Sequence, residues 1–131
     1  MADGIQDGGC LCGAVRFRVT GPLREIVACH CSMCRRATGT FVAATAAADA
    51  DMVVTGADTL TWFRSSDEAE RGFCRQCGSN LFWRRPGSGR TSILAGSLDQ
   101  PTGLAIARHI FVADKGDFYE IGDEAPRHDA W

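Results

Sequence analysis

The hydrophobic residues of this chain fall mostly into short runs in which apolar and polar positions alternate. The clearest case is Val15, Phe17 and Val19, each of which is followed by a polar residue. A period of two places such residues on one face of a β-strand, so we expect a strand with one buried face here. Further strands are predicted at residues 41–45, 52–55, 59–64, 80–84, 91–95, 108–112 and 118–121.

Glycine and proline residues separate these runs. Residues 56–58 and residues 85–90 have the composition of tight turns. One short helix is predicted over residues 32–38, with Gly39 as a left-handed cap just past its end. Many short strands with closely spaced turns predict a mainly β fold, sandwich- or barrel-like, built from short antiparallel sheets with one short helix.

The size of the chain fits one domain. Its 131 residues contain no internal repeat and no linker long enough to divide them, so we expect a single domain over residues 1–131. Hydrophobic residues make up 45% and charged residues 23% of the chain, which are ordinary globular values. This composition argues against a disordered protein and against a coiled coil.

Charge and hydropathy narrow the range of partners. Fourteen lysines and arginines against sixteen acidic residues give a net charge of −2, which argues against a nucleic-acid-binding protein. We find no apolar run close to the ~20 residues that a membrane helix needs. Residues 1–7 also lack the basic and apolar regions of a secretory signal. We therefore expect a cytoplasmic protein that binds neither nucleic acid nor membrane, and the oligomeric state stays open.

Seven cysteines are the unusual feature of the composition. The count is odd, so a closed set of disulfides would leave one thiol over. The cysteines also fall into three groups, a C-x-C at residues 10–12, a C-x-C-x-x-C at residues 29–34 and a C-x-x-C at residues 74–77. In a reducing compartment such groups are more often metal ligands than disulfides.

The spacing suggests how the seven cysteines divide. Cys29, Cys31 and Cys34 lie within one short segment, so they form a natural three-ligand site. The other four then form a closed site that joins two distant parts of the chain, and they are Cys10, Cys12, Cys74 and Cys77. A closed four-cysteine zinc site is structural, whereas a three-ligand site leaves one position for water or substrate. We therefore expect two zinc ions per chain.

A zinc ion held by three thiolates should differ from one held by three neutral histidines. Its net charge of −1 makes it a poor generator of hydroxide. Its soft surroundings favour another sulfur ligand, so the expected fourth ligand is an external thiol held as thiolate. A thiolate held in this way would be ready to attack an electrophilic carbon.

Two other interpretations of Cys29, Cys31 and Cys34 stay open. The site could be a second structural zinc that is closed by a histidine. His30 is a poor candidate, because the middle residue of a C-x-C points away from its neighbours, but His109 and His128 are possible. Disulfide switching at Cys31 and Cys34 is the other alternative, although the βαβ context of redox C-x-x-C motifs is absent. By itself, His109 is more often a strand histidine with a satisfied hydrogen bond.

Together these motifs resemble the glutathione-dependent formaldehyde-activating (GFA) family. The segments that carry the resemblance are GGCLCGAVRF at residues 8–17, CHCSMCRR at 29–36, GFCRQCGS at 72–79 and HIFV at 109–112. Three ordered cysteine motifs at matching spacing are specific, and the resemblance extends from about residue 8 to residue 121. Residues 115–119 depart from the family pattern, where relatives often carry a tryptophan.

The resemblance implies both a fold and an activity. It implies tent-like β-sheets, a structural zinc on the four-cysteine group, and a catalytic zinc on Cys29, Cys31 and Cys34. The implied activity is that of a carbon–sulfur lyase that joins glutathione, or a similar small thiol, to an aldehyde such as formaldehyde to give S-hydroxymethylglutathione. The sequence names no general base. The alternative function is a non-catalytic, zinc-stabilised binding module with two structural zinc sites.

Overall fold

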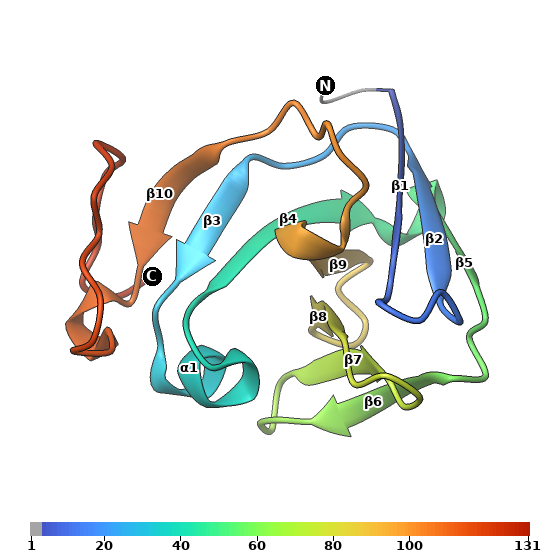
Figure 1. The fold of residues 1–131 in the computed structure, drawn as a ribbon, viewed down its shortest axis with the longest axis horizontal. Coiled ribbons are helices and arrows are strands. Elements are labelled where there is room, and N and C mark those ends of the chain that lie inside the picture. The colour runs from blue at the N-terminus through green and yellow to red at the C-terminus, as the bar shows by residue number, and fades with distance from the viewer. Residues whose placement is uncertain (1–3) are drawn as a thin grey trace.

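The computed structural model describes residues 4–131, which form two β-sheets joined along one side (Figure 1). The smaller sheet has the strand order β1-β2-β5 and the larger one β10-β3-β4-β9-β8-β7-β6. The strands are β1 (Ile5–Gly9), β2 (Arg16–Thr20), β3 (Ile26–Cys29), β4 (Val42–Ala48), β5 (Met52–Thr55), β6 (Leu60–Arg64), β7 (Glu70–Cys74), β8 (Asn80–Arg84), β9 (Arg90–Leu94) and β10 (Ile106–Ile110). The helical segments are α1 (Ser32–Thr38) and three single 3-10 turns, Asp49–Asp51, Ala95–Ser97 and Val112–Asp114.

The smaller sheet shows the expected alternation most clearly. In β2, Phe17 and Val19 are buried, while the residues between and beside them are exposed. The strand pairs antiparallel with β1 on one side and with β5 on the other. Its buried face contributes to the main core, where the Phe17 ring meets the Phe82 ring edge-on at a centroid distance of 5.2 Å.

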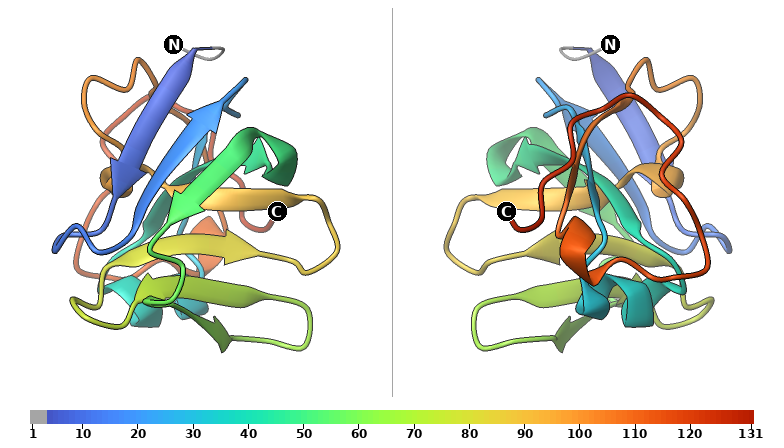
Figure 2. Two further views of the ribbon diagram at one scale, coloured as in Figure 1. Left: turned by 90° about the vertical axis from the view of Figure 1, so that its right-hand side faces the viewer. Right: turned by 90° about the vertical axis from the view of Figure 1, so that its left-hand side faces the viewer.

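The larger sheet is mixed rather than purely antiparallel. β10 runs parallel to β3, and the other neighbouring pairs are antiparallel. Figure 2 shows β9, β8, β7 and β6 following one another across the sheet, away from the smaller sheet. Because β10 follows β9 along the chain yet pairs with β3, residues far apart in the sequence meet at this end of the sheet.

A glycine allows two aromatic rings to meet across the strands β6, β7 and β8. Gly72 in β7 is paired with Trp62 on one side and with Phe82 on the other. The two rings stack at a centroid distance of 6.0 Å, and the Arg84 guanidinium lies 3.6 Å from the centroid of the Trp62 ring. A β-carbon at Gly72 would lie 3.0 to 3.2 Å from atoms of that ring, so the indole occupies the space above the glycine.

The prediction of a mainly β fold with one short helix is confirmed. Helix α1 begins and ends as expected, and Gly39 caps it in the left-handed region with φ of 94°. Residues 118–121 were wrongly predicted as a strand, because they lie in an irregular segment where Tyr119 packs its side chain inward. Three strands were not predicted, namely β1, β3 and β7.

The segment after β10 turns back along that strand. The His109 N–H donates to the Pro126 carbonyl at 2.8 Å, and the His128 N–H donates to the His109 carbonyl at 2.9 Å. The Phe111 N–H donates to the Ala130 carbonyl at 3.0 Å. Residues 126–130 therefore cover the free edge of β10, as the red segment beside that strand shows in Figure 1. Within residues 4–131, the helices are all too short or too polar to cross a bilayer.

Candidate metal centres

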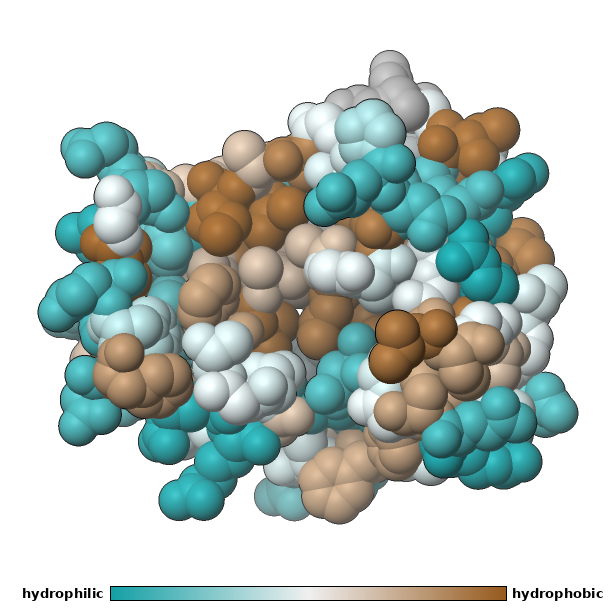
Figure 3. Space-filling model, in the orientation of Figure 1, coloured by the Kyte–Doolittle hydropathy of each residue, from teal (hydrophilic) through white to brown (hydrophobic). Residues whose placement is uncertain are grey.

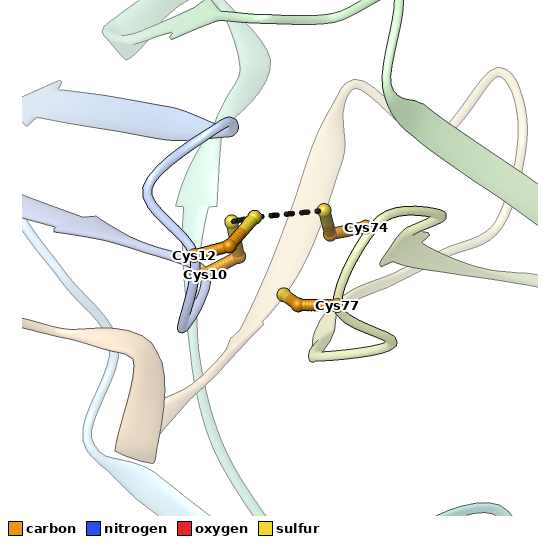
Figure 4. Close-up of side chains that lie close together, drawn as sticks. All are labelled: Cys10, Cys12, Cys74 and Cys77. Carbon is orange, nitrogen blue, oxygen red and sulfur yellow. Dashed lines mark hydrogen bonds between the residues drawn. The ribbon is translucent and has the colours of Figure 1, made fainter.

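The four-cysteine group joins the loop between β1 and β2 to the turn between β7 and β8. Figure 4 shows Cys10 and Cys12 facing Cys74 and Cys77 from opposite sides. All four sulfur atoms lie within 4.8 Å of one another. The Sγ atoms of Cys10 and Cys12 are 3.7 Å apart, and those of Cys12 and Cys74 are 3.8 Å apart. A tetrahedral zinc with Zn–S bonds of ~2.3 Å has sulfur–sulfur edges of about 3.8 Å, so these residues fit such an ion.

Local hydrogen bonds shape both sides of this group. The Val15 N–H points at the Cys10 sulfur at 3.3 Å. In the other turn, Gly78 has φ of 80° and its N–H donates to the Cys74 carbonyl at 2.7 Å. The Leu11 N–H donates to the Ser79 hydroxyl at 3.0 Å and so ties the two loops together. Hydrogen bonds from Ser79 lower the pKa of Cys77 to about 5, which favours the thiolate that a metal needs.

The three-cysteine group lies where β3 passes into α1. Cys29 ends β3, Cys31 is the N-cap of α1, and Cys34 lies in the first turn of that helix. Their sulfur atoms lie within 4.8 Å of one another. The Cys34 N–H points at the Cys31 sulfur at 3.3 Å. A short β-strand that leads directly into a helix therefore brings three sulfurs to one point.

Hydrogen bonds among the three sulfurs favour a thiolate at Cys31 over one at Cys29 or Cys34. The hydrogen-bonded thiols of Cys29 and Cys34 lower the pKa of Cys31 to about 2, while the contact with Cys31 raises the pKa of Cys29. The two terminal nitrogens of the Arg71 guanidinium lie 3.8 and 3.9 Å from the Cys34 sulfur. This cation offsets part of the negative charge that several thiolates would bring together.

Within residues 4–131, the three sulfurs gain no fourth ligand from histidine, cysteine or a carboxylate. His109 and His128, the residues considered as closing ligands, lie outside the group. His30 also lies outside it, although it stands between two of the cysteines. The described part of the chain thus presents one complete set of four sulfurs and one set of three.

A buried hydrogen-bonded network lies directly beside the three-cysteine group. The His30 Nε2 is 2.9 Å from the His109 Nδ1, and the His30 Nδ1 is 2.6 Å from the Tyr119 hydroxyl. The His109 Nε2 lies 3.0 Å from both carboxylate oxygens of Asp123. The two histidines are only 1% and 3% exposed. Burial lowers the pKa of His30 to about 4, so this ring is neutral at neutral pH.

This network was not predicted from the sequence. His109 does lie in a strand with its hydrogen bonds satisfied, as expected for an isolated strand histidine. His30, however, is separated by 79 residues from His109 and by 89 from Tyr119. No local spacing motif links these positions, and the parallel pairing of β3 with β10 that brings the two histidines together has no sequence signature of its own.

A cleft of about 520 Å³ extends from the four-cysteine group, at Cys10, to the residues that join α1 to β4. At one end it is lined by Cys10, Leu11 and Ser79, and at the other by Phe41, Val42 and Leu94. Val42 and Leu94 pack against the three-cysteine group, and the Phe41 ring lies 4.9 Å from the His30 ring. Figure 3 shows a hollow near the middle of the face that is turned toward the viewer in Figure 1, with apolar and weakly polar residues at its border. The cleft therefore adjoins the three-cysteine group through Val42 and Leu94, while the cysteines themselves do not line it.

Residues 5–114 match the family model described as glutathione-dependent formaldehyde-activating enzyme. This match covers both cysteine groups and most of the fold. The chain belongs to this family. The resemblance seen in the three cysteine motifs is thereby confirmed, while Tyr119 and Asp123 of the buried network lie beyond the matched residues.

Individual relatives agree with membership of the GFA family. A putative glutathione-dependent formaldehyde-activating enzyme of Halomonas elongata is 33% identical over 130 residues, with 89% of this chain and 81% of the relative covered. An uncharacterized lyase of Schizosaccharomyces pombe is 25% identical over 120 residues, with 90% and 86% covered. A crystal structure of a Rhodobacter sphaeroides protein superposes with a TM-score of 0.60 at 32% identity, covering 72% of this chain and 88% of the other.

Proposed function

We propose that this GFA-family protein is a zinc-dependent carbon–sulfur lyase that acts on glutathione, or a similar small thiol, and an aldehyde such as formaldehyde. In this proposal a structural zinc is held by Cys10, Cys12, Cys74 and Cys77. A second zinc is held by Cys29, Cys31 and Cys34. The proposal also places the protein in the cytoplasm.

The observation that carries the proposal is the difference between the two cysteine groups. Four sulfurs converge in one group, whereas three converge in the other, whose neighbours Val42 and Leu94 line a cleft large enough for a small substrate. Zinc sites with three protein ligands are the ones that bind water or substrate in the fourth position. The difference in ligand number therefore supports one structural and one catalytic ion.

The chemistry follows from the kind of ligand. When bound, zinc on three thiolates would hold an incoming thiol in its nucleophilic, deprotonated form. The residues of the chain would supply the surroundings for this. Arg71 offsets the charge at Cys34, and Val42 and Leu94 give the group an apolar side. The name of the family agrees with a thiol and formaldehyde as the two reactants.

Replacing one ligand of the three-cysteine group tests the proposal. We expect Cys31→Ser to lower the enzymatic rate at least 100-fold, because the metal would lose a thiolate and its bound thiol. The rate of S-hydroxymethyl adduct formation from ¹³C-formaldehyde and glutathione, measured by NMR above the uncatalysed rate, reports this loss. Circular dichroism should stay unchanged, since the group lies outside the main core.

A control and a spectroscopic measurement separate this function from that of a binding module. Cys12→Ser should lower the melting temperature far more than Cys31→Ser does. Zinc-edge X-ray absorption of the wild type should show a changed sulfur shell when glutathione is added. Full turnover by Cys31→Ser, or two zinc ions whose sulfur shell is indifferent to every thiol tried, would contradict the lyase proposal. The second result would favour a zinc-stabilised binding module.

A further inference from the structure

The segment beyond the family match contributes two side chains to the buried network at the three-cysteine group. Tyr119 reaches His30, and Asp123 reaches His109. Backbone hydrogen bonds along β10 hold the same segment in place. Residues 116–131, which we call the C-terminal segment, therefore supply polar partners to the interior beside the candidate metal ligands as well as covering a sheet edge.

In each buried histidine, one ring nitrogen has its hydrogen-bond partner in the C-terminal segment. Asp123 is the partner of the His109 Nε2, and Tyr119 is the partner of the His30 Nδ1. A buried polar atom without a partner is costly, and the two rings are almost inaccessible to water. The segment is therefore required if these two imidazoles are to stay buried beside the cysteines.

The carboxylate at one end sets the direction of every hydrogen bond in the network. An ionised carboxylate only accepts, so the His109 Nε2 must donate to Asp123. With one proton on each ring, the His109 Nδ1 then accepts from the His30 Nε2. The His30 Nδ1 is left as an acceptor, and the Tyr119 hydroxyl donates to it.

We infer that the C-terminal segment is a positioning device for the three-cysteine group, in which Asp123 fixes, through His109, the tautomer and orientation of His30. His30 stands between two of the candidate ligands, and its own N–H donates to the Ile110 carbonyl at 3.0 Å. Its ring also contacts Phe41, which lines the cleft. Holding the ring in one orientation thus holds both the ligand segment and the wall of the cleft. His30, His109, Tyr119 and Asp123 are positioning residues here, and the link to catalysis rests on the proposed function.

Asp123→Asn is a sharp test because an amide group can donate to His109 and so reverse the direction of the hydrogen bonds in the network. The Asp123 Oδ1 also accepts the Ala125 N–H at 3.0 Å. An asparagine that keeps its oxygen on that N–H places its NH₂ group in the position of the other carboxylate oxygen, which lies 3.0 Å from the His109 Nε2. The His109 Nε2 would then accept, and both imidazoles would carry their proton on Nδ1. The packing volume would stay nearly the same.

The tautomers can be read by ¹H–¹⁵N NMR of the full chain, purified with zinc and labelled at histidine. We expect Nε2–H on both His30 and His109 in the wild type, and Nδ1–H on both in Asp123→Asn. Tyr119→Phe should leave both tautomers as in the wild type, because the direction is set from the Asp123 end. Asp129→Asn is the matched control, since the Asp129 carboxylate has no side-chain partner among the described residues, and it should change nothing.

Three NMR outcomes would overturn the inference. They are a proton on the His30 Nδ1 in the wild type, a doubly protonated His109, or an Asp123→Asn spectrum like that of the wild type. Each would show that the carboxylate does not set the direction of the network. The measurement requires no turnover, so it stays informative if the proposed lyase activity fails.

The consequence for the metal group is tested by zinc release. Removing an outer partner of a metal site typically costs about 10- to 100-fold in affinity or activity. We expect Asp123→Asn to release the first zinc equivalent to a chelator about 10-fold faster and to lower kcat about 10-fold with little change in KM. Wild-type release and wild-type kcat in a variant whose tautomers are reversed would refute the positioning role. Release from the four-cysteine group should not change.

Discussion

Gly56 shows how a single residue fixes the connection between the two sheets. It follows β5 and has φ of 76°, in the left-handed region that favours glycine. A β-carbon at this position would lie 1.8 Å from the Ala14 carbonyl oxygen. The chain crosses from one sheet to the other here, against the loop that carries Cys10 and Cys12, so the glycine permits a close backbone approach.

We predict that Gly56→Ala lowers the free energy of unfolding by ~3 kcal/mol, because the backbone strain and the clash with Ala14 add up. Gly87→Ala is the matched control. Gly87 has φ of 84°, but its β-carbon would meet nothing within 4 Å. Its cost should be only about 1 kcal/mol, from the left-handed conformation alone. Urea unfolding of the zinc-loaded proteins measures both values, and equal costs would show that the close approach to Ala14 does not matter.

At the candidate sites, sequence reasoning succeeds where the chemistry is local. Cys29, Cys31 and Cys34 lie within one short segment of the sequence, and the structure brings their sulfurs together as expected. Tyr119 and Asp123 could not be found in this way, since a tyrosine and an aspartate in an irregular segment look like ordinary surface residues. Their role depends on a segment that folds back along β10, and this is a property of the tertiary structure.

At the scale of the elements, the neighbouring strands β6, β7 and β8 have a glycine at their centre, although a β-branched residue has the higher strand propensity. Gly72 is buried between Trp62 and Phe82, and it leaves room for their rings to stack. The Glu70 carboxylate accepts from the Arg84 Nε at 2.7 Å, which holds the guanidinium over the indole. The stability of this part of the sheet thus depends on side-chain packing over a gap in one strand.

We predict that Gly72→Val destabilises the protein by about 2 kcal/mol, because the indole must leave its place above the strand. Strand propensity alone gives the opposite sign, since valine is favoured over glycine in strands. Thermal unfolding of the zinc-loaded protein decides between the two, and tryptophan fluorescence reports the Trp62 environment in a background where Trp83 and Trp131 are replaced by phenylalanine. A stabilised variant would mean that Trp62 can move aside freely.

The strands that were predicted and those that were missed differ in one respect. β2 and β8 carry their own signal, in the form of apolar residues at strand spacing. β1 has the sequence IQDGG, which has little strand propensity, and it becomes a strand because it pairs with β2. β3 has only four residues and gains its place between β4 and β10. Such strands depend on partners supplied by the rest of the fold.

For the whole molecule, the four-cysteine group is a long-range connection. The contact between Cys12 and Cys74 spans 62 residues and joins the β1–β2 loop to the β7–β8 turn. The main core packs against both sides, since Cys10 and Cys74 are among its buried residues. A metal ion at this point would hold together the two parts of the chain that enclose the core.

We predict that zinc leaves the molecule in two steps when a chelator is added. The first equivalent should come from Cys29, Cys31 and Cys34, and circular dichroism should hardly change. The second should leave more slowly and together with unfolding, because structural zinc contributes on the order of 10 kcal/mol to folding. Unfolding that accompanies the first equivalent, or a second release without unfolding, would contradict the assignment of the two roles.

The order of the cysteines along the chain also has a consequence for biosynthesis. In a growing polypeptide the thiols of Cys29, Cys31 and Cys34 are all present as soon as this short segment has been made. The four-cysteine group must wait for Cys77, and the partners of His30 and His109 must wait for Tyr119 and Asp123. Translation runs from the N-terminus, so the three-cysteine group is complete first and the four-cysteine group second. The residues that orient His30 and His109 are made last.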